Sequence, residues 1–211
     1  DRLTVDAKLN YIREDIQNGL SQGESFDNPN RHALRLPPNI RTSDIEQFEY
    51  TDATGSNRQH YWNPGSNGGA NPYWTINRNQ RQSATDRILG FASLRYQLTD
   101  QLSIQVRSAI DKLNVDADYT QWNDNYIIAD NGRYTVTKRS DSELNNDLLI
   151  SYNDNLSDDL SLSVNFGANN RKERGTTLSA NTGDALLVPN FFALQSQTIR
   201  ATQTIAGANG S

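Results

Sequence analysis

The stretch Leu160-Ser-Leu-Ser-Val-Asn-Phe-Gly-Ala168 decides the fold, because apolar and polar or small side chains alternate along it without a break. Successive side chains of a strand point to opposite faces, so this segment has one apolar face and one polar face. Similar alternation runs through most of the segment from Asp86 to Arg171, which we interpret as two tandem β-hairpins. The sequence therefore predicts an antiparallel, all-β structure made of amphipathic strands.

The two hairpins repeat each other in sequence. Leu98-Thr-Asp-Gln-Leu-Ser-Ile104 is matched by Leu156-Ser-Asp-Asp-Leu-Ser-Leu162, and a tyrosine precedes each turn, at Tyr96 and Tyr152. An aspartate next to serine or threonine can bond its own backbone, which favours a tight reversal of the chain. The repeat indicates one hairpin design used twice, not a helical solenoid.

The connections between the predicted strands differ greatly in length. We expect strands near residues 1–13, 86–98, 102–119, 133–153 and 159–172, with long loops over residues 14–85, 120–132 and 173–211. A change of alternation near Leu113 predicts a β-bulge there. The turns near Asp100 and Asp158 are short, and the connections at the other end are long. This asymmetry is typical of outer-membrane β-barrels.

The composition excludes several classes of protein and site. Hydrophobic residues make up 35% of the 211 residues, which is low for a packed globular domain. The net charge is −5 with the charges interspersed, so nucleic-acid binding has no support. The absence of cysteine excludes disulfides, thiolate metal sites and cysteine nucleophiles within these residues. No methionine is present and no signal peptide can be recognised, so we expect either an internal fragment of a longer protein or a processed protein.

Alternation by itself fits two environments for the apolar face. A soluble sheet with one solvated face has the same pattern as a barrel strand in lipid. Strand length favours the barrel: about 13 residues at about 3.3 Å each, tilted by about 40°, rise about 33 Å and cross an apolar band about 25 Å tall. Sandwich strands are commonly about five or six residues long. In a sandwich, Leu160, Leu162, Val164 and Phe166 would be sealed between two layers.

Several segments resemble the barrel of the SusC-like TonB-dependent outer-membrane transporters, in the same order and with similar spacing. They are Asn71-Pro-Tyr-Trp74, the strand Ile88-Leu-Gly-Phe-Ala-Ser-Leu-Arg-Tyr96, the segment Asn145-Asn-Asp-Leu-Leu-Ile-Ser-Tyr152, the strand end Phe166-Gly-Ala-Asn-Asn-Arg171 and Val188-Pro-Asn-Phe-Phe192. The similarity covers most of residues 1–194. No one of these motifs is specific, so the resemblance depends on their order.

The resemblance implies a barrel of about 22 strands with an N-terminal plug, located in the cell outer membrane. Such transporters import glycans or peptides, are capped by a SusD-like surface lipoprotein and are driven by the TonB complex. This chain would supply about five transmembrane strands and their extracellular loops, while the plug domain is not present in it. Five strands cannot close in lipid, so the resemblance requires the rest of the barrel. The alternative is a soluble or surface-displayed β-sheet domain for binding or adhesion.

Aromatic residues in the long loops are the candidate ligand-binding residues. Aromatic rings at one rim could stack on sugar faces or hold a partner protein. The alternative, which we favour, is that they pack the long loops against each other. The candidates are Trp62, Tyr73, Trp74, Trp122 and Tyr126.

Other polar groups support weaker hypotheses. Asp124 and Asp130, with Asn125 and Asn131, could bind calcium, but they lack the spacing of a known calcium loop, and an Asx-rich turn is the favoured interpretation. No nucleophilic triad, carboxylate pair, zinc spacing or phosphate loop is present, so we expect no enzymatic activity, metal or cofactor. Three arginines on polar strand faces could line a lumen or pair with carboxylates of adjacent strands: Arg95, Arg107 and Arg171.

Overall fold

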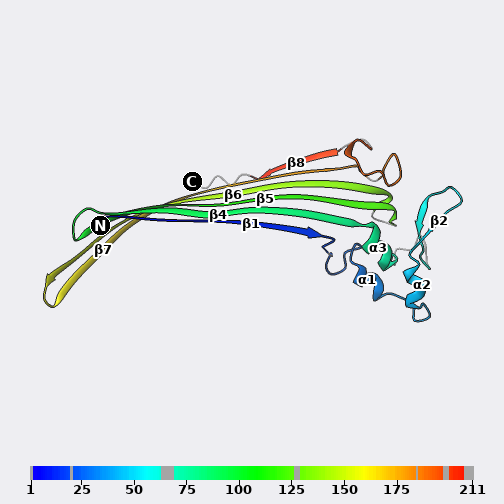
Figure 1. Ribbon diagram of the computed structural model, residues 1–211, viewed down its shortest axis with the longest axis horizontal. Coiled ribbons are helices and arrows are strands. Elements are labelled where there is room, and N and C mark those ends of the chain that lie inside the picture. The colour runs from blue at the N-terminus through cyan, green and yellow to red at the C-terminus, as the bar shows by residue number, and fades with distance from the viewer. Residues whose placement is uncertain are drawn as a thin grey trace.

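A computed structural model of the chain describes residues 2–19, 21–62, 69–125, 129–183, 185–196 and 200–206. Its main feature is an antiparallel sheet with the strand order β1-β4-β5-β6-β7-β8 (Figure 1). The strands are β1 Leu3–Gln17, β4 Gln80–Gln97, β5 Leu102–Asn125, β6 Ala129–Ser157, β7 Leu160–Asn181 and the short β8 Arg200–Ala206. Within the described residues β1 and β8 are the two edges of this sheet, which is therefore open. The antiparallel β prediction is confirmed.

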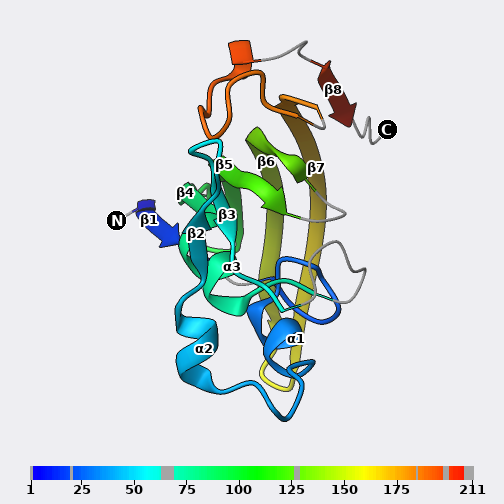
Figure 2. The ribbon, with the colours of Figure 1, turned by 90° about the vertical axis from the view of Figure 1, so that its right-hand side faces the viewer.

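The long connection from β1 to β4 is folded rather than extended. It contains the helices α1 Pro29–Ala33, α2 Thr42–Glu46 and α3 Pro72–Arg78, and a small hairpin of β2 Glu49–Thr51 and β3 Asn57–Gln59. A 3-10 turn, Leu194–Ser196, follows β7. Figures 1 and 2 show the three helices and the β2–β3 hairpin gathered at one end of the large sheet. We call this assembly the end domain.

Several expectations about the strands were wrong in detail. Residues 120–125 and 129–132, expected in a loop, continue β5 and β6, and β7 runs to Asn181. Residues 14–17 and 80–85, also expected in a loop, belong to β1 and β4. No bulge occurs near Leu113, since its pairing with Arg87 and Asp141 lies in unbroken registers. Leu113 and Val115 simply face the opposite side of the sheet from Ile110. The change of pattern therefore marks where the apolar side chains change face. The register shift lies instead between Asn155 and Ser157.

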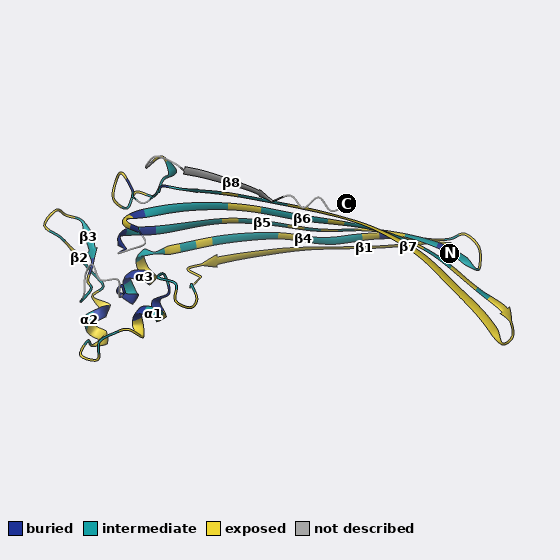
Figure 3. Ribbon diagram, turned by 180° about the vertical axis from the view of Figure 1, so that it is seen from behind, coloured by how far each residue is buried: buried dark blue, intermediate teal, exposed yellow. Residues whose placement is uncertain are grey.

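The sheet has an apolar face and a charged face. Odd-numbered residues of β1 and even-numbered residues of β4 to β7 share the apolar face, as the registers require. Its side chains are exposed, including Leu9 (74%) and Phe166 (63%). Leu160, Leu162 and Val164 are exposed as well, so no second layer of the described chain covers them. Figure 3 shows β1 and much of β7 exposed along their lengths.

The small hydrophobic core lies away from the middle of the sheet. The buried hydrophobic residues belong to the end domain or to the sheet end that contacts it: Ile45, Ala70, Trp74, Ala129 and Leu186. Figure 3 shows the buried positions concentrated near α3 and at the adjacent ends of β5 and β6. The molecule thus combines a packed end with a sheet whose apolar face has no cover among the described residues.

The apolar run crosses the strands obliquely. On β1 the apolar run ends at Tyr11. The row of residues that pair across the sheet from Tyr11 consists of Ile88 on β4, Lys112 on β5, Ser142 on β6 and Arg174 on β7. On β7 the run ends at Ala168, six residues nearer the short turns than Arg174, which averages about 1.5 residues for each of the four strand steps. The displacement is uneven, because the runs of β1 and β4 end in one row and the last apolar residues of β5 and β6, Ile110 and Leu144, share another. With a rise of about 3.3 Å per residue and strands about 4.8 Å apart, the border is inclined to the strands by about 45°.

The short turns follow the same slope. Leu102, the first residue of β5, is aligned through Tyr152 with Val164. β7 begins at Leu160, so the β6–β7 hairpin extends about four residues further than the β4–β5 hairpin. Figure 1 shows the β6–β7 hairpin projecting beyond the β4–β5 turn. The turns and the apolar border are therefore displaced in the same direction.

Candidate functional site

Tryptophans hold the end domain onto the sheet. Trp74 of α3 is fully buried, and its ring meets that of Trp122 on β5 edge-on with centroids 6.3 Å apart. Phe192, from the segment after β7, packs against Trp122 at 6.3 Å. The Arg78 guanidinium lies over the Trp122 ring, 4.4 Å from its centroid. Three segments distant in sequence are thus joined by one aromatic cluster.

The other candidate aromatic residues lie outside this cluster. Tyr73 and Trp62 are half-buried, and Trp62 packs against Tyr61 with ring centroids 4.2 Å apart. Tyr126 lies outside the described residues. Trp74, having no exposed surface, can contact a ligand only if the end domain opens. The geometry therefore gives Trp74 a packing role and leaves the half-buried Trp62 and Tyr73 as the candidates nearer the surface.

A buried polar network connects the end domain to the tip of β5. Asn71 is fully buried; its side chain donates to the carbonyl oxygens of Ile45 and His60, both at 2.9 Å, and accepts from the Tyr73 backbone N–H at 2.9 Å. Its backbone N–H donates to the Gln59 side-chain oxygen at 2.9 Å. The sequence signal for Asn71 was its position before Pro72, where asparagine caps a helix and proline starts it.

Gln59 and Asp124 continue this network. The Gln59 backbone N–H donates to the Asp124 carboxylate at 2.7 Å, and the Gln59 side chain donates to the Asp124 carbonyl at 2.5 Å. The Arg58 guanidinium lies 3.8 Å from the same carboxylate. Burial raises the pKa of Asp124, since the charged form loses water there, although the Gln59 N–H and Arg58 oppose the shift. Nothing in the composition of residues 57–60 indicated this contact with β5.

Two of the four possible calcium ligands, Asp124 and Asn125, bond other protein groups. The Asp124 carboxylate accepts from Gln59, and Asn125 exchanges two amide hydrogen bonds of 2.8 Å with Asn79. Asn131 pairs with Asn123 in the β5–β6 register. Within the residues that the structure describes, no group of three or more histidine, aspartate or glutamate side chains is placed to hold a metal ion.

A buried histidine fixes the start of the end domain. His32 accepts at Nδ1 from the Ala70 N–H, 3.1 Å away, so Nε2 carries the proton and donates to the Phe26 carbonyl at 2.5 Å. The ring is therefore neutral. Burial lowers the pKa of His32, and the neighbouring guanidinium of Arg31 acts in the same direction. Sequence analysis assigned this residue no role.

The charged face of the sheet carries paired charges. Arg87 and Asp111 form a two-pronged ion pair across β4 and β5, with contacts of 2.9 and 2.6 Å. Arg171 donates to Glu143 at 2.9 Å. Arg107 lies over the Phe91 ring, and Arg95 donates to Ser103 at 3.4 Å. Arg171 thus pairs with a carboxylate of an adjacent strand, while the other two proposed lumen arginines have neutral partners.

The segment after β7 presents exposed apolar side chains near the end domain. Leu186 of the segment after β7 is buried against the tip of β5 and β6, whereas Leu187, Val188 and Phe191 are exposed. Among the described residues no helix is long and apolar enough to cross a membrane. No protein-family model and no curated protein matches this chain. The arrangement can present a surface to a ligand or a partner, and its buried carboxylate and histidine serve the packing of the end domain.

Proposed function

We propose that the sheet is part of the wall of a larger outer-membrane β-barrel that imports glycan or peptide nutrients, as the SusC-like TonB-dependent transporters do. The apolar face contacts lipid, and the charged face lines the interior. The end domain forms part of the extracellular vestibule. The rest of the barrel, a plug, the TonB complex and a SusD-like surface lipoprotein would be its partners.

The observation that carries this proposal is the oblique apolar border. A hydrocarbon layer has flat limits, so strands that cross it at an angle must each begin and end their apolar runs at a different point along the sheet. The inclination of about 45° agrees with the tilt of about 35–45° that barrel strands have. The displaced short turns support the same tilt independently. Open sheet edges cannot face lipid unpaired, which supports further strands beside β1.

The identity of the transported solute class is supported by the sequence resemblance alone. The half-buried rings of Trp62 and Tyr73, at the end of the sheet that would face outward, supply surfaces on which a sugar or a side chain could stack. No catalytic group is needed for this function, since the protein would bind and pass a solute.

Aligned positions with opposite side-chain character test the proposal. Ile88 and Arg174 lie in one aligned row on the same face, but Ile88 is the last residue of the apolar run of β4 and Arg174 lies six residues beyond the end of the run of β7. We expect a fluorophore at Ile88→Cys of the complete protein to be quenched by lipids brominated on their acyl chains, and one at Arg174→Cys to be quenched little. This chain adds no cysteine of its own to compete for the label. Equal quenching at both positions, or none at Ile88, would contradict a lipid-facing wall.

The alternative function, a soluble or surface-displayed sheet, predicts a different behaviour in buffer. A soluble or surface-displayed sheet would keep the complete protein folded and monomeric in plain buffer, with no dependence on detergent. Loss of the folded state on detergent removal, together with quenching at Ile88, is the expected result.

A further inference from the structure

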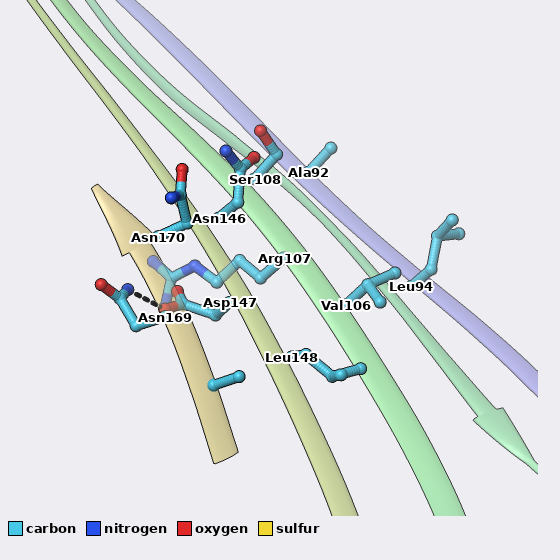
Figure 4. Close-up of a pocket in the computed structure, with 11 residues that line it drawn as sticks. Ala92, Leu94, Val106, Arg107, Ser108, Asn146, Asp147, Leu148, Asn169 and Asn170 are labelled. Carbon is cyan, nitrogen blue, oxygen red and sulfur yellow. Dashed lines mark hydrogen bonds between the residues drawn. The ribbon is translucent and has the colours of Figure 1, made fainter. Parts of the chain in front are cut away.

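The apolar face contains a polar row that has no partner. Ser108, Asn146 and Asn170 are aligned on β5, β6 and β7, directly beside the apolar row of Val106, Leu148 and Ala168. Figure 4 shows these side chains at one open hollow of the sheet, together with Ala92, Leu94 and three residues of the other face, Arg107, Asp147 and Asn169. Within the described chain the side chains of the three polar residues have no hydrogen-bond partner. An amide facing hydrocarbon without a partner is costly, so this row calls for an external polar group.

Three unpaired cations lie immediately beyond that row. Lys172 is two residues past Asn170 on β7, and Lys112 and Arg174 flank Ser142 in the next aligned row. All three are exposed, and none forms an ion pair within the described residues. On this same face of β1 and β4 to β7, the other described cations are paired, Lys138 with Asp116 at 3.2 Å and Arg13 with Asp86 at 3.4 Å. The contrast distinguishes this cluster from ordinary strand charges.

Two of the three cations lie at a similar depth relative to the oblique border, and Arg174 lies two residues further out on β7. Because the border falls by about 1.5 residues per strand, Lys112 on β5 and Lys172 on β7 stand at nearly the same distance beyond the apolar run. Strands two positions apart are separated by about 10 Å, so three long side chains can reach one phosphate group. The turns at the opposite end carry only acidic charges: Asp100, Asp154, Asp158 and Asp159.

We propose that β5, β6 and β7 form a binding site for a phosphate-bearing membrane lipid in the leaflet nearer the end domain. The hollow beside Val106 and Leu148 receives an acyl chain. The amides of Asn146 and Asn170 bond the ester or hydroxyl groups of the linker region. Lys112, Lys172 and Arg174 bind the phosphate. This inference depends on the proposed lipid-facing role of the apolar face.

Native mass spectrometry of the complete protein tests this site. The probes are phosphatidylglycerol, diacylglycerol with the same acyl chains, and inorganic phosphate. We expect retention of phosphatidylglycerol only, and binding about tenfold weaker when the cations are removed in Lys112→Gln/Lys172→Gln/Arg174→Gln. The matched control, Arg87→Gln/Arg139→Gln/Arg171→Gln, removes three charges from the other face and should bind as the parent does. Equal binding of diacylglycerol, or of phosphatidylglycerol by the triple variant, would overturn the site, as would binding of phosphate alone.

The amides of Asn146 and Asn170 allow a second test, which separates a role in lipid binding from a role in stability. Replacing Asn146 and Asn170 by leucine removes two unpaired polar groups, so the variant should fold at least as well as the parent and yet hold phosphatidylglycerol less tightly. Unchanged lipid binding would refute the role of the amides. Quenching of the fluorophore at Ile88→Cys is measured in the same samples. Quenching without preferential binding of phosphatidylglycerol rejects the lipid-binding site alone. Absence of quenching rejects the lipid-facing role of the sheet as well.

Discussion

The end domain and the sheet solve the problem of apolar surface in opposite ways. The end domain buries Trp74 and Ile45 in a small core and satisfies Asn71 and Gln59 inside it. The sheet leaves Leu9 and Phe166 largely exposed. A soluble protein rarely exposes a continuous apolar surface of this extent, so such a face marks an interaction with another apolar phase. Under the proposed function, one chain would be folded for water at one end and for lipid along its length.

The largest expected effect is in the core of the end domain. Trp74→Ala removes the buried ring that contacts Trp122, and a change of this kind costs about 3–5 kcal/mol. We expect faster hydrogen exchange in α3 and β3, while the amides of the central strands stay protected. Trp62→Ala, at a half-buried position, is the control and should change exchange little. Equal loss of protection in the sheet would show that the two regions are one cooperative unit.

The next effect concerns the apolar face. In the complete protein folded in lipid vesicles, Leu162→Arg should lower the free energy of unfolding by about 2–4 kcal/mol, because the position lies inside the apolar run. Urea titration of the vesicle-bound protein measures it. Ser163→Arg, one residue further and on the charged face, should change stability far less. If both variants unfold at the same urea concentration as the parent, the two faces of the sheet do not differ in their environment.

A smaller effect is expected from the buried polar network. Asn71→Ala leaves the carbonyl oxygens of Ile45 and His60 and the Tyr73 N–H without their partner, which costs about 1–3 kcal/mol. Thermal unfolding followed by tryptophan fluorescence reports on the nearby Trp74. Asn71→Asp is the informative control, since it keeps the acceptor for Tyr73 and loses both donors. A variant as stable as the parent would mean that water replaces the network.

The smallest expected effect is a pH dependence, because one group titrates. The pKa of His32 is lowered by burial, so the unfolded segment binds a proton that the folded one does not. Stability of the end domain therefore falls as the pH drops below about 6.5, the ordinary histidine value. The protection factors of the amides of residues 26–36, obtained from hydrogen exchange at pH 7.5 and 5.5, measure this loss of stability. His32→Gln should abolish the difference in protection between the two pH values. A difference that persists in this variant must come from another titrating group.

The strand pattern was predictable from sequence because period-two alternation is a local property. Leu160 to Ala168 identified an amphipathic strand without any knowledge of its neighbours. The bounds were less accessible: residues 120–125 are polar, with Asn and Asp typical of loops, yet pairing with β6 keeps them in a strand. The misplaced bulge near Leu113 has the same origin, since the sequence shows a change of face but not its cause.

The end domain was largely hidden from sequence reasoning. Its helices have only five to seven residues, too short to produce a periodic pattern. The tryptophans were recognised by residue type, and the packing role favoured for them describes Trp74 and Trp122. The contacts of His32 with Ala70 and of Gln59 with Asp124 were not predicted, because each pair is distant in sequence and no local pattern encodes it.

The oblique border has a consequence for any strand that joins the free edge of β1. Under the proposed function, the apolar run of such a neighbour has to reach about one and a half residues further toward the end domain than the run of β1 does. Otherwise its lipid-facing side chains would not be aligned with those of the other strands. A candidate partner segment can therefore be accepted or rejected by counting positions before any experiment is done. Under the proposed function, each further strand of the barrel beside β1 has to continue this displacement.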